Sequence, residues 1–270
     1  MKSLKLNRSD IDLSKLMQTL RKDARKKEEF FRYIGDGPIL EIGCGSGQVL
    51  KRMSHAFPDA ALYGIDADSR MIAAAKRKNI PNCVFYNSLA QSPVELASKV
   101  NNVIFPASLH EIVSFSNNAD VYQTFRNVHS YLTKGGVAII WEGMRSDYGN
   151  ITISDSPALG GLVKFARQFE YKKYFFEKTG KTKYSVSFDL LAEYVTKKDR
   201  LDIQMEYKET HFPLNHAEYE DLLKSTGFEI SVFNKKPLHQ NELEWIHRNL
   251  RLEEDISNIP VYVLIVAKKP

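Results

Sequence analysis

The feature that most constrains this chain is a glycine-rich turn at residues 38–47, with the sequence PILEIGCGSG. A short apolar run leads into it, glycines alternate at Gly43, Gly45 and Gly47, and a helical pattern begins at about residue 46. Glycines reach positive φ and let a ligand approach the backbone, while a helix N-terminus presents unpaired N–H groups and a partial positive charge. The pattern therefore predicts a strand, a tight turn and a helix that together bind a ligand.

A carboxylate follows at the distance that a nucleoside ligand would need. A second apolar run, at residues 61–65, ends at Asp66. An acid about 20 residues beyond such a turn can accept hydrogen bonds from both hydroxyls of a ribose. Dinucleotides and S-adenosylmethionine both suit this pattern, but the dinucleotide fingerprint G-x-G-x-x-G would place its third glycine at Gln48. The spacing therefore disfavours a dinucleotide.

The arrangement E-x-G-x-G-x-G, which begins at Glu41, resembles motif I of the class I S-adenosylmethionine-dependent methyltransferases. Residues 64–68 (GIDAD) resemble the next motif of that family, and residues 132–136 (LTKGG) resemble its turn before the fifth strand. The resemblance covers about residues 38–143. It implies a doubly wound, mostly parallel seven-stranded sheet with an antiparallel last strand. It also implies S-adenosyl-L-methionine as cofactor, with transfer of its methyl group to an oxygen, nitrogen or carbon of an acceptor.

Strands and helices alternate from residue 38 to about residue 143, which favours a parallel sheet with helices on both faces. We expect strands at 38–42, 61–65, 83–87, 102–106 and 136–141, and helices at 46–54, 68–78 and 119–132. Ligands of such sheets bind beyond the carboxyl ends of the strands. With the resemblance, this rule gives as candidate cofactor-binding residues Glu41, Gly43, Cys44, Gly45, Gly47, Asp66, Ala67, Asn87, Ser88, Leu89 and Phe105.

Leu89 departs from the family pattern, which commonly has an acid there to bind the adenine amino group. We therefore expect adenine to be held by Ser88, backbone groups and apolar packing.

Three residues after the fourth and fifth predicted strands are candidates for catalysis, namely His110, Glu111 and Glu142. A neutral imidazole can take a proton near pH 7, so His110 is the candidate general base. Alternatively, His110 packs under a loop or binds a backbone carbonyl. The two glutamates are candidates for orienting the substrate. Methyl transfer to a good nucleophile depends more on positioning than on acid or base help.

The remaining segments suggest three parts. Residues 1–37 predict an N-terminal helix at 10–34 whose outer face, with Arg21, Lys22 and Arg25, is basic. Residues 38–143 and 211–270 predict the cofactor-binding core, which ends with a helix at 218–227, strands at 228–233 and 261–267, and an extra helix between those strands. Residues 144–210 interrupt the alternation and predict an inserted, mainly helical lid.

The insertion alternates lysines with aromatic rings. Its basic residues between positions 164 and 183 are Lys164, Arg167, Lys172, Lys173, Lys178, Lys181 and Lys183. Base stacking and phosphate contacts would use such a pattern, and so would a lid whose rings pack inward and whose lysines face water. The lid is the favoured interpretation. The partner is then a small-molecule acceptor, with an RNA methyltransferase and a cofactor-binding subunit without activity as alternatives.

Composition limits the remaining choices. A net charge of +5 over 270 residues does not by itself indicate a nucleic-acid partner. The two cysteines form no ligand-like pair, and the histidines lack the spacing of a zinc site, so we expect no metal. The sequence shows no signal-peptide pattern and no apolar stretch of membrane-spanning length. We therefore expect a cytoplasmic protein that does not enter a membrane.

Overall fold

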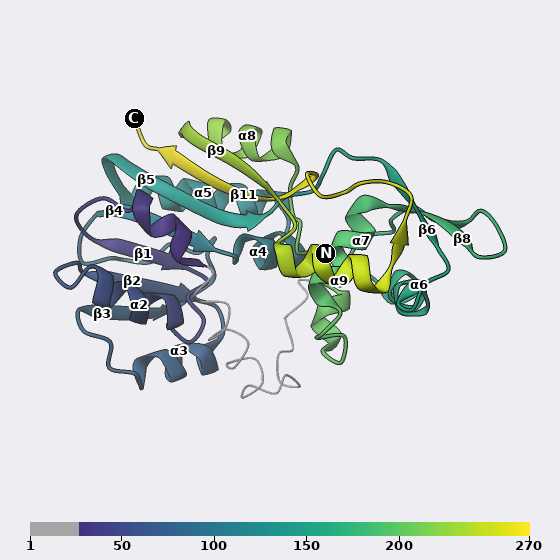
Figure 1. Cartoon of the computed structure of the whole chain (residues 1–270). Helices are drawn as coiled ribbons and strands as arrows, with labels where there is room; N and C mark the ends of the chain where they lie inside the picture. The colour runs from purple at the N-terminus through teal and green to yellow at the C-terminus, as the bar shows by residue number, and fades with distance from the viewer. Residues whose placement is uncertain (1–26) are drawn as a thin grey trace. The chain divides into compact units, whose positions relative to one another are not determined.

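The computed structural model describes residues 27–270, and its main feature is a seven-stranded sheet with the order β3-β2-β1-β4-β5-β11-β9 (Figure 1). The sheet is mostly parallel and has an antiparallel strand, which confirms the predicted α/β fold class. Its strands are β1 (Ile39–Ile42), β2 (Leu62–Asp66), β3 (Cys83–Asn87), β4 (Val100–Pro106), β5 (Leu132–Gly143), β9 (Glu229–Pro237) and β11 (Pro260–Lys268).

Helices cover both faces of this sheet. They are α2 (Gln48–Ala56), α3 (Ser69–Lys76), α4 (Leu109–Phe115), α5 (Asn118–Tyr131) and α8 (His216–Ser225). Successive side chains of a strand point to opposite faces. Accordingly, Ile104 of β4 joins the core that contains Leu50 of α2, and Phe105 stacks on Phe125 of α5 with ring centroids 5.1 Å apart. The sheet is therefore doubly wound, as predicted.

The predicted strands agree with β1, β2 and β3 to within a residue, whereas β4 and β5 both begin earlier than predicted. Val100 pairs with Leu132, and a register irregularity separates this pair from the next one, Asn102 with Val137. The turn predicted at residues 132–136 therefore lies inside an irregular start of β5, where Gly135 has a φ of 79°.

The predicted N-terminal helix lies mostly outside the described residues, and with it Arg21, Lys22 and Arg25. The described part is a 3-10 helix, η2 (Lys27–Tyr33). Its Phe30 is buried in the same core as Leu50.

The chain divides into two compact units. Among the described residues, the first contains residues 27–142, 217–234 and 264–270, and the second contains residues 143–216 and 235–263. The predicted domain boundaries stay a prediction.

The second unit holds a four-stranded antiparallel sheet, in the order β10-β6-β8-β7, that the sequence analysis did not foresee. Its strands are β6 (Asn150–Ser154), β7 (Phe176–Lys178), β8 (Lys183–Ser187) and β10 (Arg251–Leu252). Its helices are α6 (Leu159–Gln168), α7 (Phe188–Lys197), η3 (Gln204–Tyr207) and α9 (Gln240–Asn249), the last being the predicted extra helix. The strands are short, so their apolar alternation is brief: only Ile151 and Ile153 are buried in β6.

Candidate functional site

The glycine turn between β1 and α2 has the backbone conformation that its sequence predicts. Gly43, Gly45 and Gly47 have φ values of 72°, 51° and 72°, which side-chain-bearing residues rarely adopt. The N–H of Gly43 donates to the carbonyl of Ile65 at 2.8 Å, which ties the turn to β2. A Cβ at Gly43 would lie 2.4 Å from the Cβ of Ser108, so both the space and the φ require glycine there.

Asp66, at the end of β2, fixes the turn from the other side. Its Oδ2 accepts from the N–H of Gly45 at 2.7 Å, and its Oδ1 accepts from the N–H of Asp68 at 2.8 Å. An ionised carboxylate can accept about four hydrogen bonds, so the same group can also bind ribose hydroxyls. Only 9% of Asp66 is exposed, which strengthens hydrogen bonds to its charge.

A pocket opens beside this turn and brings together five of the predicted cofactor-binding residues: Gly43, Asp66, Ala67, Ser88 and Leu89. Leu89 is 51% exposed and presents an apolar surface in the pocket wall. The wall thus offers a carboxylate, a hydroxyl, a backbone cradle and an apolar surface. This donor set suits a ligand that combines a ribose with an aromatic base.

Two asparagine side chains fix the loop after β3 by hydrogen bonds to backbone carbonyls. The Nδ2 of Asn87 donates to the carbonyls of Asp66 and Ala67, both at 3.0 Å, so Asn87 anchors the loop. Asn127 of α5 donates to the carbonyls of Ala90 and Gln91 at 3.2 and 2.9 Å. These bonds fix the backbone that carries Leu89.

The other predicted cofactor-binding residues do not line this pocket. Glu41 and Cys44 are buried, and Gly47 packs near Phe85. Burial, with Glu41 and Asp66 nearby, raises the pKa of the Cys44 thiol well above its usual range, so it stays protonated at neutral pH. Phe105 is fully buried against α5.

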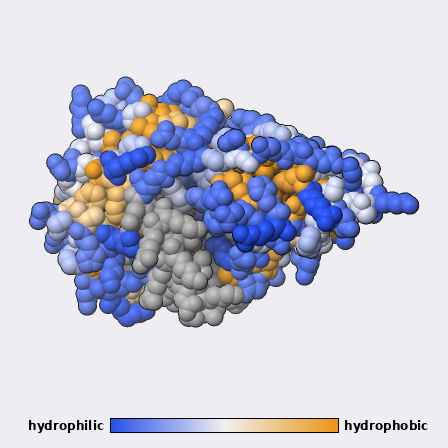
Figure 2. Space-filling model, in the orientation of Figure 1, coloured by the Kyte–Doolittle hydropathy of each residue, from blue (hydrophilic) through white to orange (hydrophobic). Residues whose placement is uncertain are grey.

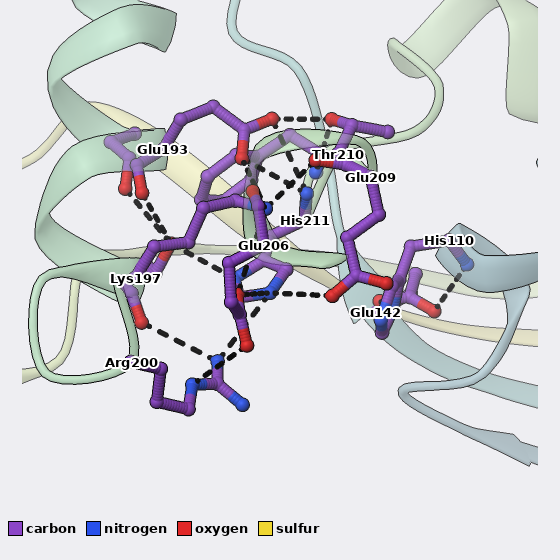
Figure 3. A network of polar contacts seen from close by, with 12 residues as sticks. His110, Glu142, Glu193, Lys197, Arg200, Glu206, Glu209, Thr210 and His211 are labelled. Carbon is purple, nitrogen blue, oxygen red and sulfur yellow. Dashed lines mark hydrogen bonds and ion pairs between the residues drawn. The ribbon is translucent and has the colours of Figure 1, made fainter. Parts of the chain in front are cut away.

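His110 and Glu142 form a hydrogen-bonded pair, although 32 residues separate them in the chain (Figure 3). Nδ1 of His110 lies 3.0 Å from Oε1 of Glu142, and the backbone N–H of His110 donates to Oε2 of Glu142 at 3.1 Å. Glu142 is the last residue but one of β5 and is 2% exposed, and its carboxylate contacts both the ring and the backbone of His110.

A strained turn places this pair. Ala107, between β4 and α4, has a φ of 56°, and its N–H donates to the carbonyl of Trp141 at 2.7 Å. Residues other than glycine and asparagine adopt this conformation at a cost, and such residues cluster at functional sites. The turn leads directly into the start of α4, which carries His110.

Residues of α4 that the sequence analysis did not single out also line the pocket. These are Ile112 and Phe115, which line it together with Glu111, the third catalytic candidate, and with Ser108, which directly precedes α4. The spacing of these positions is that of one helix face. A test for helical periodicity after the fourth strand would have found them. Gln91 was missed as well, since it lies in a loop and follows no periodic pattern.

In the second unit, aromatic rings of the insertion face its core and the basic residues face water. Phe165 and Phe169 are buried, and Tyr171, Tyr174 and Tyr184 pack against the same cluster. All seven basic residues between positions 164 and 183 are exposed. Figure 2 shows hydrophilic residues over the hairpin of β7 and β8. This is the inward-ring pattern that favoured a lid.

The second unit also contains a network of buried charges, drawn in Figure 3. The Lys197 side chain of α7 has no exposed surface, and its Nζ donates to the carbonyls of Glu206 and Glu209, both at 2.8 Å. The same Nζ lies 3.6 Å from Oε2 of Glu193 and 3.8 Å from Oε2 of Glu206. Arg200 contributes a further contact, with its Nε 3.2 Å from Oε1 of Glu206. The network fastens residues 206–209 to α7.

Comparison with known proteins finds methyltransferases among the proteins that are similar to this chain. Residues 39–136 match the family model described as "Methyltransferase domain". A malonyl-[acyl-carrier protein] O-methyltransferase of Bacillus anthracis is 32% identical over 102 residues, which are 37% of this chain and 35% of that protein. A trans-aconitate 2-methyltransferase of Deinococcus radiodurans is 23% identical over 133 residues, 47% of this chain and 48% of that protein. The chain thus spans a third to a half of the length of these relatives.

A solved structure is similar over almost the whole chain. The crystal structure of a SAM-dependent methyltransferase from Methanosarcina mazei matches with a TM-score of 0.53 and 19% identity, over 89% of this chain and 96% of that one. At this identity the likeness shows the fold.

Proposed function

We propose that this chain, in which residues 39–136 are a class I S-adenosylmethionine-dependent methyltransferase domain, is an enzyme that transfers a methyl group from S-adenosyl-L-methionine to a small-molecule acceptor. The observation that carries the proposal is the joint geometry of the glycine turn and Asp66. Gly43 and the buried carboxylate of Asp66 line one pocket, and Asp66 also holds the backbone of Gly45, so the pocket wall and the positive-φ turn are fixed together.

The residues that would hold the cofactor follow from this geometry. Asp66 would accept hydrogen bonds from the ribose hydroxyls, and the turn at Gly43 and Gly45 would let the rest of the cofactor approach the backbone. Leu89 would pack against the adenine ring. When bound, S-adenosylmethionine supplies a methyl group on a positively charged sulfur. The protein's task is then to align the acceptor with that methyl group and to exclude water.

A small acceptor is favoured over RNA because several lysines of the insertion already contact other groups of the protein. Lys173 donates to the carbonyl of Phe169 at 3.1 Å, and the Nζ of Lys172 lies 5.3 Å from the centroid of the Tyr174 ring. Lys183 forms an ion pair with Glu253. The relatives named above also act on acceptors other than RNA by their names. An RNA-binding surface would instead need a continuous line of basic side chains that do not already contact other groups of the protein.

The site of action is proposed as the cytoplasm. No helix among residues 27–270 is long and apolar enough to span a membrane. Cys44 and Cys83 are both free thiols, which suits a reducing compartment.

Calorimetry with S-adenosylhomocysteine tests the cofactor site. Asp66→Ala should lower the affinity roughly ten- to a hundredfold, because the loss of charge-assisted hydrogen bonds costs about 1.5–3 kcal/mol. Asp68→Asn is the matched control, since its amide oxygen can keep the hydrogen bond from the N–H of Arg70 and its affinity should stay near that of the wild type. Equal affinities for the wild type and Asp66→Ala would remove the assignment.

Measurements of turnover distinguish a small-molecule methyltransferase from an RNA methyltransferase and from a cofactor-binding subunit without activity. The release of S-adenosylhomocysteine should occur with small-molecule mixtures and should change little on addition of total RNA. Dependence on RNA, with binding that weakens steeply as salt rises, would favour the RNA methyltransferase. Tight cofactor binding without turnover on any acceptor would favour a cofactor-binding subunit.

A further inference from the structure

The pair of His110 and Glu142 indicates which class of acceptor the enzyme takes. We propose that the acceptor is a hydroxyl compound, an alcohol or a phenol, that reaches the site with its proton and gives it to Nε2 of His110. Glu142 is the positioning residue that sets the tautomer of His110. This inference rests on the proposed methyltransferase function and names the substrate class of the same site.

The hydrogen bonds of Glu142 determine where the imidazole carries its proton. Oε2 accepts from the backbone N–H of His110 at 3.1 Å, and Oε1 lies 3.0 Å from Nδ1. An ionised carboxylate only accepts hydrogen bonds, so Nδ1 must carry the proton. In the neutral ring the lone pair then lies on Nε2, the nitrogen that can act as a base. The bond to Nδ1 also opposes a flip of the ring, and the bond from the backbone N–H of His110 fixes the carboxylate that makes it.

The position of this pair connects it to the cofactor pocket. Ser108, which directly precedes α4, and Glu111, in the first turn of α4, lie on either side of His110 in the chain, and both line the pocket. The strained Ala107 turn and the hydroxyl of Ser108, which donates to the carbonyl of Ile42 at 2.6 Å, fix the start of α4 against the glycine turn. His110 is therefore held within one helical turn of the pocket wall.

The chemistry of the acceptor follows from the charges and from the base. A carboxylate acceptor is already a nucleophilic anion, so it needs no base, and Glu111 and Glu142 would repel it. A neutral amine attacks through its lone pair and loses its proton only after methylation. A hydroxyl oxygen becomes a good nucleophile as its proton leaves, which is the step that a base accelerates.

The proposed step is balanced without any further reactant. The acceptor O–H bond breaks, and its proton goes to Nε2 of His110. An oxygen lone pair forms a bond to the methyl carbon, and the electron pair of the breaking C–S bond returns to the sulfonium sulfur. The products are a methyl ether, neutral S-adenosylhomocysteine and an imidazolium whose charge Glu142 stabilises.

The tautomer can be measured without knowing the acceptor. In ¹⁵N NMR spectra of the full chain with S-adenosylhomocysteine bound, neutral His110 should carry its proton on Nδ1. In Glu142→Gln the side-chain amide can donate to Nδ1, so the proton should move to Nε2. A wild-type His110 protonated on Nε2 would overturn the proposal.

Turnover then tests the acceptor class, with 4-methylphenol, 4-methylaniline and 4-methylbenzoate as matched probes. We expect methylation of the phenol, a rise of kcat/KM with pH, and a loss of about 10²- to 10⁴-fold in His110→Gln. Glu142→Gln should lower kcat and alter the pH profile, with partial recovery in Glu142→Asp. His55→Gln, at an exposed position in α2, is the control and should match the wild type.

The outcomes also separate this inference from the proposed function. Methylation of the benzoate alone, or methylation of the phenol that is unchanged in His110→Gln, would overturn the hydroxyl assignment and leave the methyltransferase intact. If none of the probes reacts, the NMR result decides the inference. Failure of the wild type to bind S-adenosylhomocysteine would instead refute the proposed function.

Discussion

Lys197→Met should strongly destabilise the second unit. Methionine has nearly the shape of lysine and can keep the contact with the Phe169 ring, whose centroid lies 5.4 Å from Nζ. The substitution therefore removes the charge and three donors with little change in volume. It leaves the carbonyls of Glu206 and Glu209 without these bonds and the carboxylate of Glu193, which has no exposed surface, without this cation.

The magnitude follows from the groups left behind. Each hydrogen bond from a charged donor contributes about 1.5–3 kcal/mol, and two at 2.8 Å are lost. Removing one partner of a buried ion pair costs about 3–5 kcal/mol in comparable cases. The burial of the methionine side chain offsets part of the loss. We therefore expect the free energy of unfolding to fall by about 3–5 kcal/mol, in line with those cases.

Urea unfolding followed by far-ultraviolet circular dichroism measures this change. Lys183→Met is the matched control, because it removes an ion pair whose side chains are 53% and 47% exposed. Exposed pairs contribute at most about 1 kcal/mol. A second substitution, Glu193→Gln, should restore part of the stability of Lys197→Met because it removes the stranded charge. A Lys197→Met protein within 1 kcal/mol of the control would refute the reasoning about buried charge.

Three further outcomes are expected. Gly43→Ala should abolish binding of S-adenosylhomocysteine in calorimetry, because the new Cβ would lie 2.4 Å from the Cβ of Ser108 at a φ of 72°; a folded variant that binds normally would contradict this. Leu89→Asp should tighten that binding up to roughly tenfold, because a carboxylate can accept from the adenine amino group, and unchanged affinity would place the adenine elsewhere. Burial raises the pKa of Asp189, although the N–H of Ser146 donates a hydrogen bond to its carboxylate. At a pH between the ordinary pKa and this raised pKa, Asp189 is therefore protonated in the folded state and ionised in the unfolded state. Stability should therefore fall as pH rises through that window, and urea midpoints from pH 4 to pH 7 should show a smaller fall for Asp189→Asn.

The parts of the structure that the sequence could predict are those that depend on residues close together in the chain. The glycine turn and Asp66 follow from spacing, because a strand end, a tight turn and a helix start are local. Phe105 shows the limit of the strand-end rule: it lies near the end of β4, yet alternation turns its ring to the opposite face, against Phe125.

Non-local pairing accounts for what the sequence did not reveal. His110 and Glu142 were each candidates, but only the neighbouring positions of β4 and β5 in the sheet make them a pair. The second sheet joins Arg251 of β10 to Ser154 of β6, residues that are distant in the chain, and no short pattern announces such a contact. Likewise, the lysine of α7 looks like a solvated charge in the sequence, and only the return of residues 206–209 buries it.

The bonds from Asp66 to the backbone of Gly45 and Asp68 have a kinetic consequence. They fix the backbone of the turn with hydrogen bonds between the protein's own groups, so we expect the turn to lose little conformational entropy when a ligand binds. Encounter rates should then be nearly the same for all variants whose turn is intact, and differences in affinity should lie in how long the complex lasts. Under the proposed function, the site would therefore select its nucleoside ligand by how long the complex lasts.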